Sequence, residues 1–312
     1  MSEPGQAADS SRPAAAPSRF GARIEGAMDR FGPLCVGIDP HPQLLERWGL
    51  ADDAAGLRTF AMTVVEALTG RVAALKPQAA FFERHGSAGL AVLEEVLATV
   101  LTASAGTQVI LDAKRGDIGS TMQGYADAYL RAGAPLACDA LTVSPFLGFG
   151  SLGPAVEAAE AAGRGLFVLA LTSNPEGASV QHAVPPGAFV HGSVAGTIAS
   201  HAAVLNGREL DGREPDGGHG TLGSVGLVVG ATVGDAVRSL GIDLAAVRGP
   251  LLAPGVGAQG AGADELAQVF GDARRAVLAA SSRAVLAAGP DPAALRDAAR
   301  AAADAAAEAL GR

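Results

Sequence analysis

The stretch QVILDAKRGDIGST, residues 108–121, runs from apolar residues into a short charged segment. If residues 108–114 form a strand, side chains two positions apart share a face, so Asp112 and Lys114 project together from its carboxyl end. Asp117 falls in the turn beyond. Two carboxylates that flank one ammonium favour its protonated form, which makes Lys114 a candidate proton donor near neutral pH. The alternative interpretation is a cluster of surface charges beside a turn.

Other apolar segments of strand length lie on both sides of this stretch. They cover residues 34–39, 72–77, 138–143, 166–172, 224–232, 250–257 and 275–281. Helical segments lie between them, so that strand and helix alternate along the chain. This alternation, with eight strands in all, favours an α/β fold. The expected architecture is a (β/α)8 TIM barrel of parallel strands ringed by helices, in preference to an open doubly wound sheet.

The helical segments are recognised by their apolar spacing and by one clear cap. Apolar residues recur at helical spacing within residues 57–68 and 90–101. Residues 121–133 and 192–206 also have helical character. A final alanine-rich helix is expected after Asp291, because an acid at the N-cap followed by proline is a typical helix start.

The whole chain fits one barrel with a short tail. Its 312 residues are 49% apolar but only 4% aromatic, which suits parallel strands of Ala, Val, Leu and Ile covered by helices. Residues 1–19, rich in Ala, Pro and Ser, are expected to form a disordered tail. Residues 20–312 are expected to form a single catalytic barrel. Within it, residues 207–223 are predicted to be a mobile surface loop without assigned chemistry.

Charge and cysteine usage exclude several classes of function. A formal net charge of −9 argues against nucleic acid as a partner, because phosphate backbones are bound by clustered Lys and Arg. Cys35 and Cys138 lack the spacing of a metal site or a disulfide framework, which predicts a reducing, cytoplasmic location. The first residues do not resemble a signal peptide, and no uninterrupted apolar run is long enough to cross a bilayer. We therefore expect a soluble protein without a membrane partner.

Polar residues gather where the predicted strands end. They are Asp39, Lys76, Asp112, Lys114, Ser173, the turn PGVG at 254–257, and Arg283. In (β/α)8 barrels the chemistry sits at the carboxyl ends of the strands. This arrangement favours the catalytic interpretation of the opening stretch.

Glycine-rich turns after the last strands predict a phosphate site. GVGAQG (255–260) matches the pattern G-x-G-x-x-G, but so does GFGSLG (148–153), and neither opens the first strand-helix unit of a dinucleotide fold. In a barrel, turns after the seventh and eighth strands commonly cradle a phosphate with backbone N–H groups. Gln259 could add an amide donor and Arg283 a bidentate fork.

Metal-dependent and serine-hydrolase chemistry lack support in the sequence. The six histidines form no H-E-x-x-H or comparable ligand pair. No serine lies in a G-x-S-x-G turn. We therefore expect no metal and no cofactor, and we interpret Ser173 as a hydrogen-bonding group.

Taken together, these motifs resemble the orotidine 5′-phosphate decarboxylase family. The resemblance spans the chain from about Leu34 to Ala288 and is closest to the longer bacterial subgroup. It rests on the segments VGID, ALKPQ, LDAKRGDIGST, TSNPEG, APGVGAQG and the late SSR. It implies decarboxylation of orotidine 5′-phosphate to uridine 5′-phosphate and CO₂ in pyrimidine biosynthesis, without a cofactor, by a homodimer with shared active sites.

The resemblance also implies roles for the charged residues. Lys114 would protonate the pyrimidine at C6, and Asp112 would face the carboxylate of the substrate. Lys76 would hold Asp112 and a ribose hydroxyl, and Asp39 would bind the ribose as well. Asp117 would cross the dimer interface.

The remaining implied roles concern substrate binding. Ile118 and Thr121 would enter the partner's site together with Asp117, and Ser173 would bind the pyrimidine ring. The substrate-binding set is completed by Pro254, Gln259 and Arg283, of which Gln259 and Arg283 would hold the phosphate. The sequence departs from the family at one position, because members often carry glycine before the phosphate-binding arginine, whereas Ser282 precedes Arg283 here.

Two other functions compete with this prediction. One is a Mg²⁺-dependent sugar-phosphate decarboxylase or epimerase of the same barrel superfamily, which resembles the chain at D-x-K-x-x-D but places a carboxylate where Lys76 stands. The other is a barrel that binds a nucleotide without catalysis. Simple binding would not require a lysine held between acids, which disfavours the second alternative.

Overall fold

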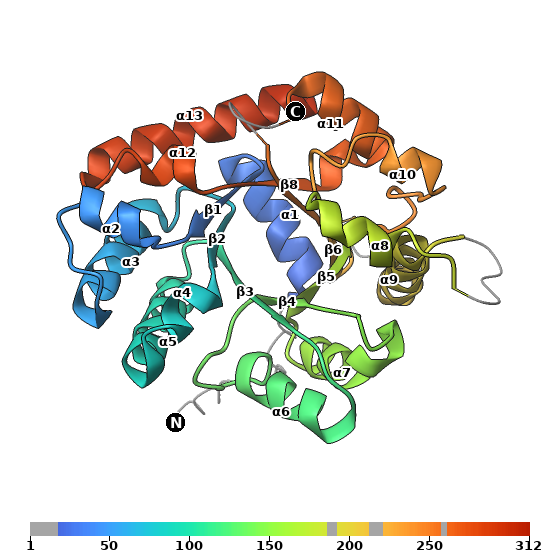
Figure 1. The fold of residues 1–312 in the computed structure, drawn as a ribbon, viewed down its shortest axis with the longest axis horizontal. Helices are drawn as coiled ribbons and strands as arrows, with labels where there is room; N and C mark the ends of the chain where they lie inside the picture. Colours follow the sequence, from blue (N-terminus) through green and yellow to red (C-terminus); the bar gives the residue numbers. More distant parts are fainter. Residues whose placement is uncertain (1–17, 186–191, 212–220, 257–260) are drawn as a thin grey trace, which may run out of the picture.

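The chain folds into a closed barrel of parallel strands, in which β1 pairs with both β2 and β8 (Figure 1). The structure is a computed structural model that describes residues 18–185, 192–211, 221–256 and 261–312. Within these residues the strands are β1 (Leu34–Ile38), β2 (Ala74–Pro77), β3 (Gln108–Arg115), β4 (Ala140–Val143), β5 (Gly165–Leu171), β6 (Val225–Val229), β7 (Leu251–Pro254) and β8 (Val277–Ser281). Apart from the closing pair of β1 and β8, neighbouring strands in the barrel are consecutive in sequence.

Helices cover the outside of this barrel (Figure 1). The longer helices of the described chain are α1 (Phe20–Phe31), α3 (Ala54–Leu68), α5 (Gly86–Ala103), α6 (Gly119–Tyr129), α7 (Gly153–Ala161), α9 (Val194–Asp211), α11 (Ala263–Phe270) and α13 (Pro292–Leu310). Shorter α-helices are α2 (Pro42–Arg47), α4 (Ala79–Glu83), α8 (Ala178–Gln181), α10 (Ala236–Ser239) and α12 (Arg283–Leu286). The 3₁₀ turns are η1 (Phe149–Leu152), η2 (Pro175–Gly177) and η3 (Gly271–Ala276).

The predicted (β/α)8 barrel is confirmed, and each predicted strand segment overlaps one strand of the structure. Several strands are shorter than predicted, among them β6, which covers Val225–Val229 of the predicted residues 224–232. The predicted final helix begins as expected, since the Asp291 side chain accepts a hydrogen bond from the backbone N–H of Ala293.

The prediction of a surface loop over residues 207–223 is wrong at both of its ends. Helix α9 continues through Asp211, and Asn206 within it is fully buried. The Asn206 amide donates to the carbonyls of Val225 and Val247 and so ties α9 to the loops around β6. Leu222 is also buried. Residues 212–220, like residues 1–17 of the expected tail, lie outside the described residues.

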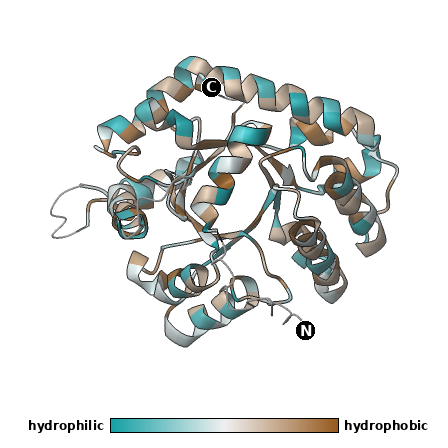
Figure 2. Ribbon diagram, turned by 180° about the vertical axis from the view of Figure 1, so that it is seen from behind, coloured by the Kyte–Doolittle hydropathy of each residue, from teal (hydrophilic) through white to brown (hydrophobic). Residues whose placement is uncertain are grey.

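Helix α1, which the sequence analysis did not anticipate, covers the amino-terminal end of the barrel (Figure 2). The Arg23 guanidinium pairs with Asp139 at 2.9 Å and donates to Gln108 Oε1 at 3.0 Å. Gln108 is the first residue of β3, and Asp139 immediately precedes β4. The ring of Phe20 occupies the space that a Cβ at Gly165 would need, with Cδ1 at 2.1 Å. Closure at this end leaves the carboxyl ends of the strands as the open side of the barrel.

Two layers of apolar side chains surround the strands, and hydrophobic residues dominate the strands themselves (Figure 2). The inner layer includes Cys35, Ile110 and Phe167, while the larger outer layer lies between strands and helices. Helix α5 is long and apolar enough, by length and composition alone, to cross a membrane. Its buried stripe, however, packs on the barrel beside α3, and Glu94 and Glu95 interrupt its apolar run.

Candidate active site

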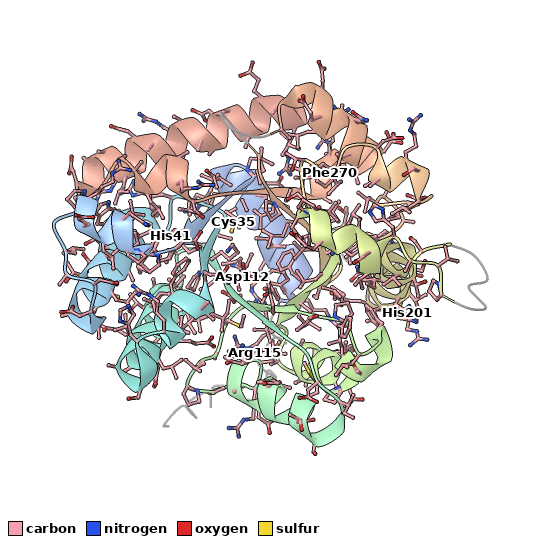
Figure 3. All side chains as sticks on the ribbon, viewed as in Figure 1. Cys35, His41, Asp112, Arg115, His201 and Phe270 are labelled. Atoms are coloured by element: carbon pink, nitrogen blue, oxygen red, sulfur yellow. The ribbon has the colours of Figure 1, made fainter. Side chains whose placement is uncertain are left out.

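Three charged side chains meet at the carboxyl ends of β2 and β3. Lys76 Nζ lies 2.9 Å from Asp112 Oδ2, and Lys114 Nζ lies 2.6 Å from Asp112 Oδ1. In Figure 3 Asp112 is near the centre of the barrel, whereas His201 lies at its periphery. The predicted projection of Asp112 and Lys114 from one strand end is therefore confirmed. One carboxylate stands between two ammonium groups.

Neighbouring polar groups hold this carboxylate in place. Thr142 of β4 donates its hydroxyl to Asp112 Oδ1 and accepts the backbone N–H of Lys114, each at 2.9 Å. The Gln78 side chain donates to the backbone carbonyl of Asp112 at 3.1 Å. With both carboxylate oxygens bonded and the backbone fixed on either side, Asp112 has little freedom to rotate. The sequence analysis assigned no role to Thr142 or Gln78.

The backbone of β3 is irregular at the reactive lysine. Lys114 has a φ of +48°, and the register between β3 and β4 shifts between Leu111 and Arg115. Positive φ is uncommon for a residue with a side chain and is found at sites where the surroundings enforce it. Bulges of this kind redirect side chains next to active sites. Here the irregularity accompanies the contact of Lys114 with Asp112.

Arg115 is the last residue of β3 and lies between the barrel and α6 (Figure 3). It pairs with Glu83 of α4, and its guanidinium lies 6.0 Å from the ring centroid of Tyr129 in α6. These contacts tie the strand end to the two helices that follow β2 and β3. The position of Lys114 is thus fixed by the contacts of Arg115 as well as by Thr142.

The two lysines determine the protonation state of the Asp112 carboxylate. Burial opposes the ionised form of Asp112, but Lys76 and Lys114 together hold its pKa below the ordinary range. A carboxyl whose pKa is lowered on folding adds stability above its ordinary pKa of about 3.9, and this stability is lost as pH falls through the lowered value. Asp112 is therefore an anion throughout the neutral range.

Lys76 is shifted in the direction that keeps it charged. Burial alone would lower its pKa, but the carboxylates of Asp112 and Asp39 raise it above the ordinary value. Cys35 lies beneath the site, where burial raises the pKa of its thiol to about 12. The thiol is thus neutral at physiological pH, and the site holds Lys76 as an ammonium.

Lys76 and Lys114 are the only lysines in the sequence. Every other residue counted among its Lys and Arg is an arginine. Arginine cannot release a proton at accessible pH, whereas a lysine ammonium can. A surface charge can be supplied by either residue, and this chain supplies it with arginine. Lysine is thus confined to the two positions that contact Asp112.

Because the chain has only two lysines, the pKa of Lys76 can be measured directly. In protein labelled with ¹⁵N at lysine Nζ, we expect Lys76 to remain an ammonium up to its ordinary pKa of about 10.4. In Asp112→Asn the burial of Lys76 is no longer compensated, so its pKa should fall below that value. A Lys114→Ala sample assigns the remaining side-chain signal to Lys76. A wild-type Lys76 that loses its proton well below the ordinary pKa would contradict the described electrostatics.

Asp39 belongs to the same site. It follows β1, and its charge contributes to the raised pKa of Lys76. Its Oδ2 accepts a hydrogen bond from Ser282 Oγ at 2.5 Å, while its Oδ1 is buried without a hydrogen-bond partner among the described residues.

The other predicted site residues occupy loops at the carboxyl end of the barrel. Ser173 follows β5, Pro254 ends β7, and Arg283 begins α12 after β8. All three are exposed. In the described part of the chain no hydrogen bond or ion pair joins them to Asp112. Gln259, the predicted amide donor, lies outside the described residues.

Asp117 differs from the expectation that two carboxylates flank Lys114. In the described chain no ion pair joins Asp117 to Lys114, and Asp117 Oδ1 instead accepts the backbone N–H of Ile118 at 2.8 Å. Ile118 is 61% exposed, and Thr121 in the first turn of α6 is also exposed. Asp117 itself is half-buried, between Lys114 and these exposed residues in the sequence.

Metal ligands do not accumulate near the site. Across the residues that the structure describes, no group of three or more His, Cys, Asp or Glu side chains could hold a metal ion. At the position where the Mg²⁺-dependent alternative needs a carboxylate, Lys76 places an ammonium against Asp112. A cation and a divalent metal would compete for the same carboxylate oxygens.

A closed barrel with a lysine–aspartate–lysine array at the carboxyl ends of its strands defines the chain as a (β/α)8-barrel enzyme. A family model described as "Orotidine 5′-phosphate decarboxylase / HUMPS family" matches residues 32–298. The chain belongs to this family, as its motifs predicted.

Curated relatives and a solved structure agree with this membership. The orotidine 5′-phosphate decarboxylase of Salinispora arenicola is 59% identical over 280 residues, covering 90% of this chain and 94% of the relative. That of Streptomyces coelicolor is 58% identical over 281 residues, with the same coverage of both chains, 90% and 94%. A crystal structure of a Streptomyces avermitilis protein assigned as an orotidine 5′-phosphate decarboxylase superposes with a TM-score of 0.85. It is 56% identical and covers 95% of this chain and 97% of its own.

Proposed function

We propose that Lys76, Asp112 and Lys114 carry out the decarboxylation of orotidine 5′-phosphate to uridine 5′-phosphate and CO₂. The chain is a carboxy-lyase of pyrimidine biosynthesis by its family and relatives. The observation that carries the residue assignment is the pair of contacts that Asp112 makes with the two lysines, at 2.9 and 2.6 Å.

The chemistry of the reaction explains why such an array is needed. Loss of CO₂ breaks the bond between C6 and the carboxylate carbon, and the electron pair stays on C6. That pair lies in the plane of the ring and cannot delocalise into the π system. A fixed ammonium beside C6 stabilises the developing charge and then donates its proton to C6. We assign this ammonium to Lys114.

Asp112 and Lys76 complete the arrangement. An anionic Asp112 that faces the carboxylate of the substrate repels it, and loss of CO₂ removes this repulsion. Lys76, buried on the other side of Asp112, holds the carboxylate in that position and offers its remaining N–H groups to the ribose. Lys114 is 46% exposed, so the neutral amine left after proton transfer can regain a proton from water once the product departs.

The phosphate of the substrate is assigned to Arg283 and Gln259, with backbone N–H groups of the glycine turns. Arg283 lies just past β8, the strand that pairs with β7. The phosphate is remote from C6, but its binding energy can be used to orient the ring and close the site. Ser173 and Pro254 line the same end of the barrel and are assigned to the pyrimidine and the bound substrate.

We further propose a homodimer in which Asp117, Ile118 and Thr121 complete the site of the partner. The loops after β3 and β4 run together, since Ser144 donates its backbone N–H to the carbonyl of Arg115 at 2.7 Å. Three large apolar side chains stand exposed on these loops: Ile118 at 61%, Phe146 at 76% and Leu147 at 53%. Exposed apolar groups that gather in this way mark association surfaces.

The remaining proposals concern domain organisation and location. We assign residues 20–312 to a single catalytic barrel, in which α1 and α13 both pack against the strands. Cys35 and Cys138 are buried free thiols, which is the usual state of cysteine in a reducing cytoplasm.

The proposed function is tested by following the absorbance loss of orotidine 5′-phosphate, with uridine 5′-phosphate titrated in parallel. We expect turnover with unchanged kcat in the presence of excess chelator, because an ammonium rather than a metal stabilises the carbanion. Turnover abolished by chelation and restored by Mg²⁺ would favour the sugar-phosphate type of chemistry. Nucleotide binding without absorbance loss would favour a binding protein.

A further inference from the structure

We propose that Ser282 is a positioning residue, which orients Asp39 toward the ribose of the substrate. The inference rests on the proposed function, in which Asp39 binds the ribose. The Ser282 hydroxyl lies at the end of β8 and donates to Asp39 Oδ2, at the end of β1, at 2.5 Å. The contact joins the last strand of the barrel to the first, where the barrel closes.

The two oxygens of Asp39 have different environments. Oδ2 receives the hydrogen bond from Ser282, whereas Oδ1 is buried and has no hydrogen-bond partner among the described residues. A buried carboxylate oxygen without a donor is costly unless a ligand supplies one. The ribose hydroxyls are donors of the required kind. Ser282 thus occupies one oxygen and leaves the other for the substrate.

Gly37 makes room for this contact. A Cβ at Gly37 would lie 1.9 Å from Ser282 Oγ and 2.8 Å from Asp39 Oδ2, so any side chain there would displace the pair. Gly37 in β1 is a strand residue, and glycine in a strand often marks a close approach of other groups. Here the group that approaches is the serine hydroxyl.

The backbone of Ser282 is itself fixed. Its carbonyl accepts the backbone N–H groups of Val285 and Leu286, the last two residues of α12. Ser281, the preceding residue, is paired with Val36 in the β1–β8 ladder. The hydroxyl is therefore presented from a rigid position between a strand and a helix. A glycine at 282 would keep the backbone but would leave Asp39 Oδ2 without its donor.

The test is a double-mutant cycle on the affinity for uridine 5′-phosphate. Ser282→Ala removes a hydrogen bond to a charged group and should raise the Kd roughly ten-fold. In the Asp39→Ala background the same change should have almost no effect, because the group that Ser282 positions is gone. Ser281→Ala, whose side chain points to the other face of the strand, is the matched control and should leave the Kd unchanged.

The outcomes separate this inference from the function on which it rests. An equal loss of affinity from Ser282→Ala with and without Asp39 would show a general structural role and overturn the inference. An unchanged Kd in Ser282→Ala would overturn it as well. In either case, wild-type turnover of orotidine 5′-phosphate would leave the proposed function standing. Absence of that turnover in the wild type would refute the proposed function itself.

Discussion

Replacement of Lys114 by alanine is expected to lower kcat for orotidine 5′-phosphate by roughly four orders of magnitude or more, since proton donation and charge stabilisation are lost together. No second group could replace it, because the only other lysine, Lys76, is buried on the far side of Asp112. The measurement is the initial rate of absorbance loss, followed with enough enzyme to detect the residual rate.

The variant should fold normally. Lys114 is 46% exposed, and without it Asp112 still contacts Lys76 and Thr142. The thermal midpoint should therefore stay close to that of the wild type. A Lys114→Arg variant keeps the positive charge but cannot release a proton, so it separates the electrostatic contribution from proton donation.

Arg300→Ala is a suitable control for this prediction. Arg300 forms an exposed ion pair with Asp297 on α13, and such pairs contribute little to stability. Its removal should change neither the rate nor the fold. Near-normal product formation by Lys114→Ala would show that another group protonates C6 and would remove the basis of the site assignment.

The barrel could be predicted from sequence because its pattern is local. Each strand is a short apolar run. Several of these runs end in a charged residue or are followed by a turn. The helices that were missed have weaker signals. Helix α1 precedes the first strand and lies outside the alternation, and its role depends on Arg23 reaching Asp139, which is 116 positions away.

The catalytic array could also be predicted from sequence, because Asp112 and Lys114 share one strand and Lys76 lies near the end of the strand before it. The residues that contact this array could not be predicted in the same way. Thr142 was visible only as a polar residue in the apolar run ALTV, and its two hydrogen bonds to β3 lie within the register shift between the two strands. The contact of Ser282 with Asp39 spans 243 positions and arises only when the barrel closes.

The role proposed for Asp117 involves a second copy of the chain. The sequence placed it beside Lys114 as a second flanking acid, whereas its carboxylate bonds to the backbone of Ile118 in the isolated chain. Its position next to the exposed side chain of Ile118 agrees with a role toward a second copy. An experiment that combines two different variants of the chain distinguishes a surface acid from a shared catalytic acid.

Mixing a Lys114→Ala chain with an Asp117→Ala chain is expected to restore activity that neither has alone. If each site combines Lys114 of one subunit with Asp117 of the other, a mixed dimer has one site with both mutations and one with neither. Random exchange of equal amounts makes half of the dimers mixed. The recovered rate should therefore approach about a quarter of the wild-type rate per chain for a twofold-symmetric dimer.

The matched control mixes Lys114→Ala with a chain that carries both substitutions. No dimer of these chains contains Lys114, so no site can be restored although subunits exchange in the same way. Differently tagged chains, purified through both tags, establish that exchange has occurred. If mixed dimers are isolated and remain inactive, Asp117 either serves the site of its own subunit or has no part in catalysis. The exposure of the Ile118 side chain would then have a cause other than a shared active site.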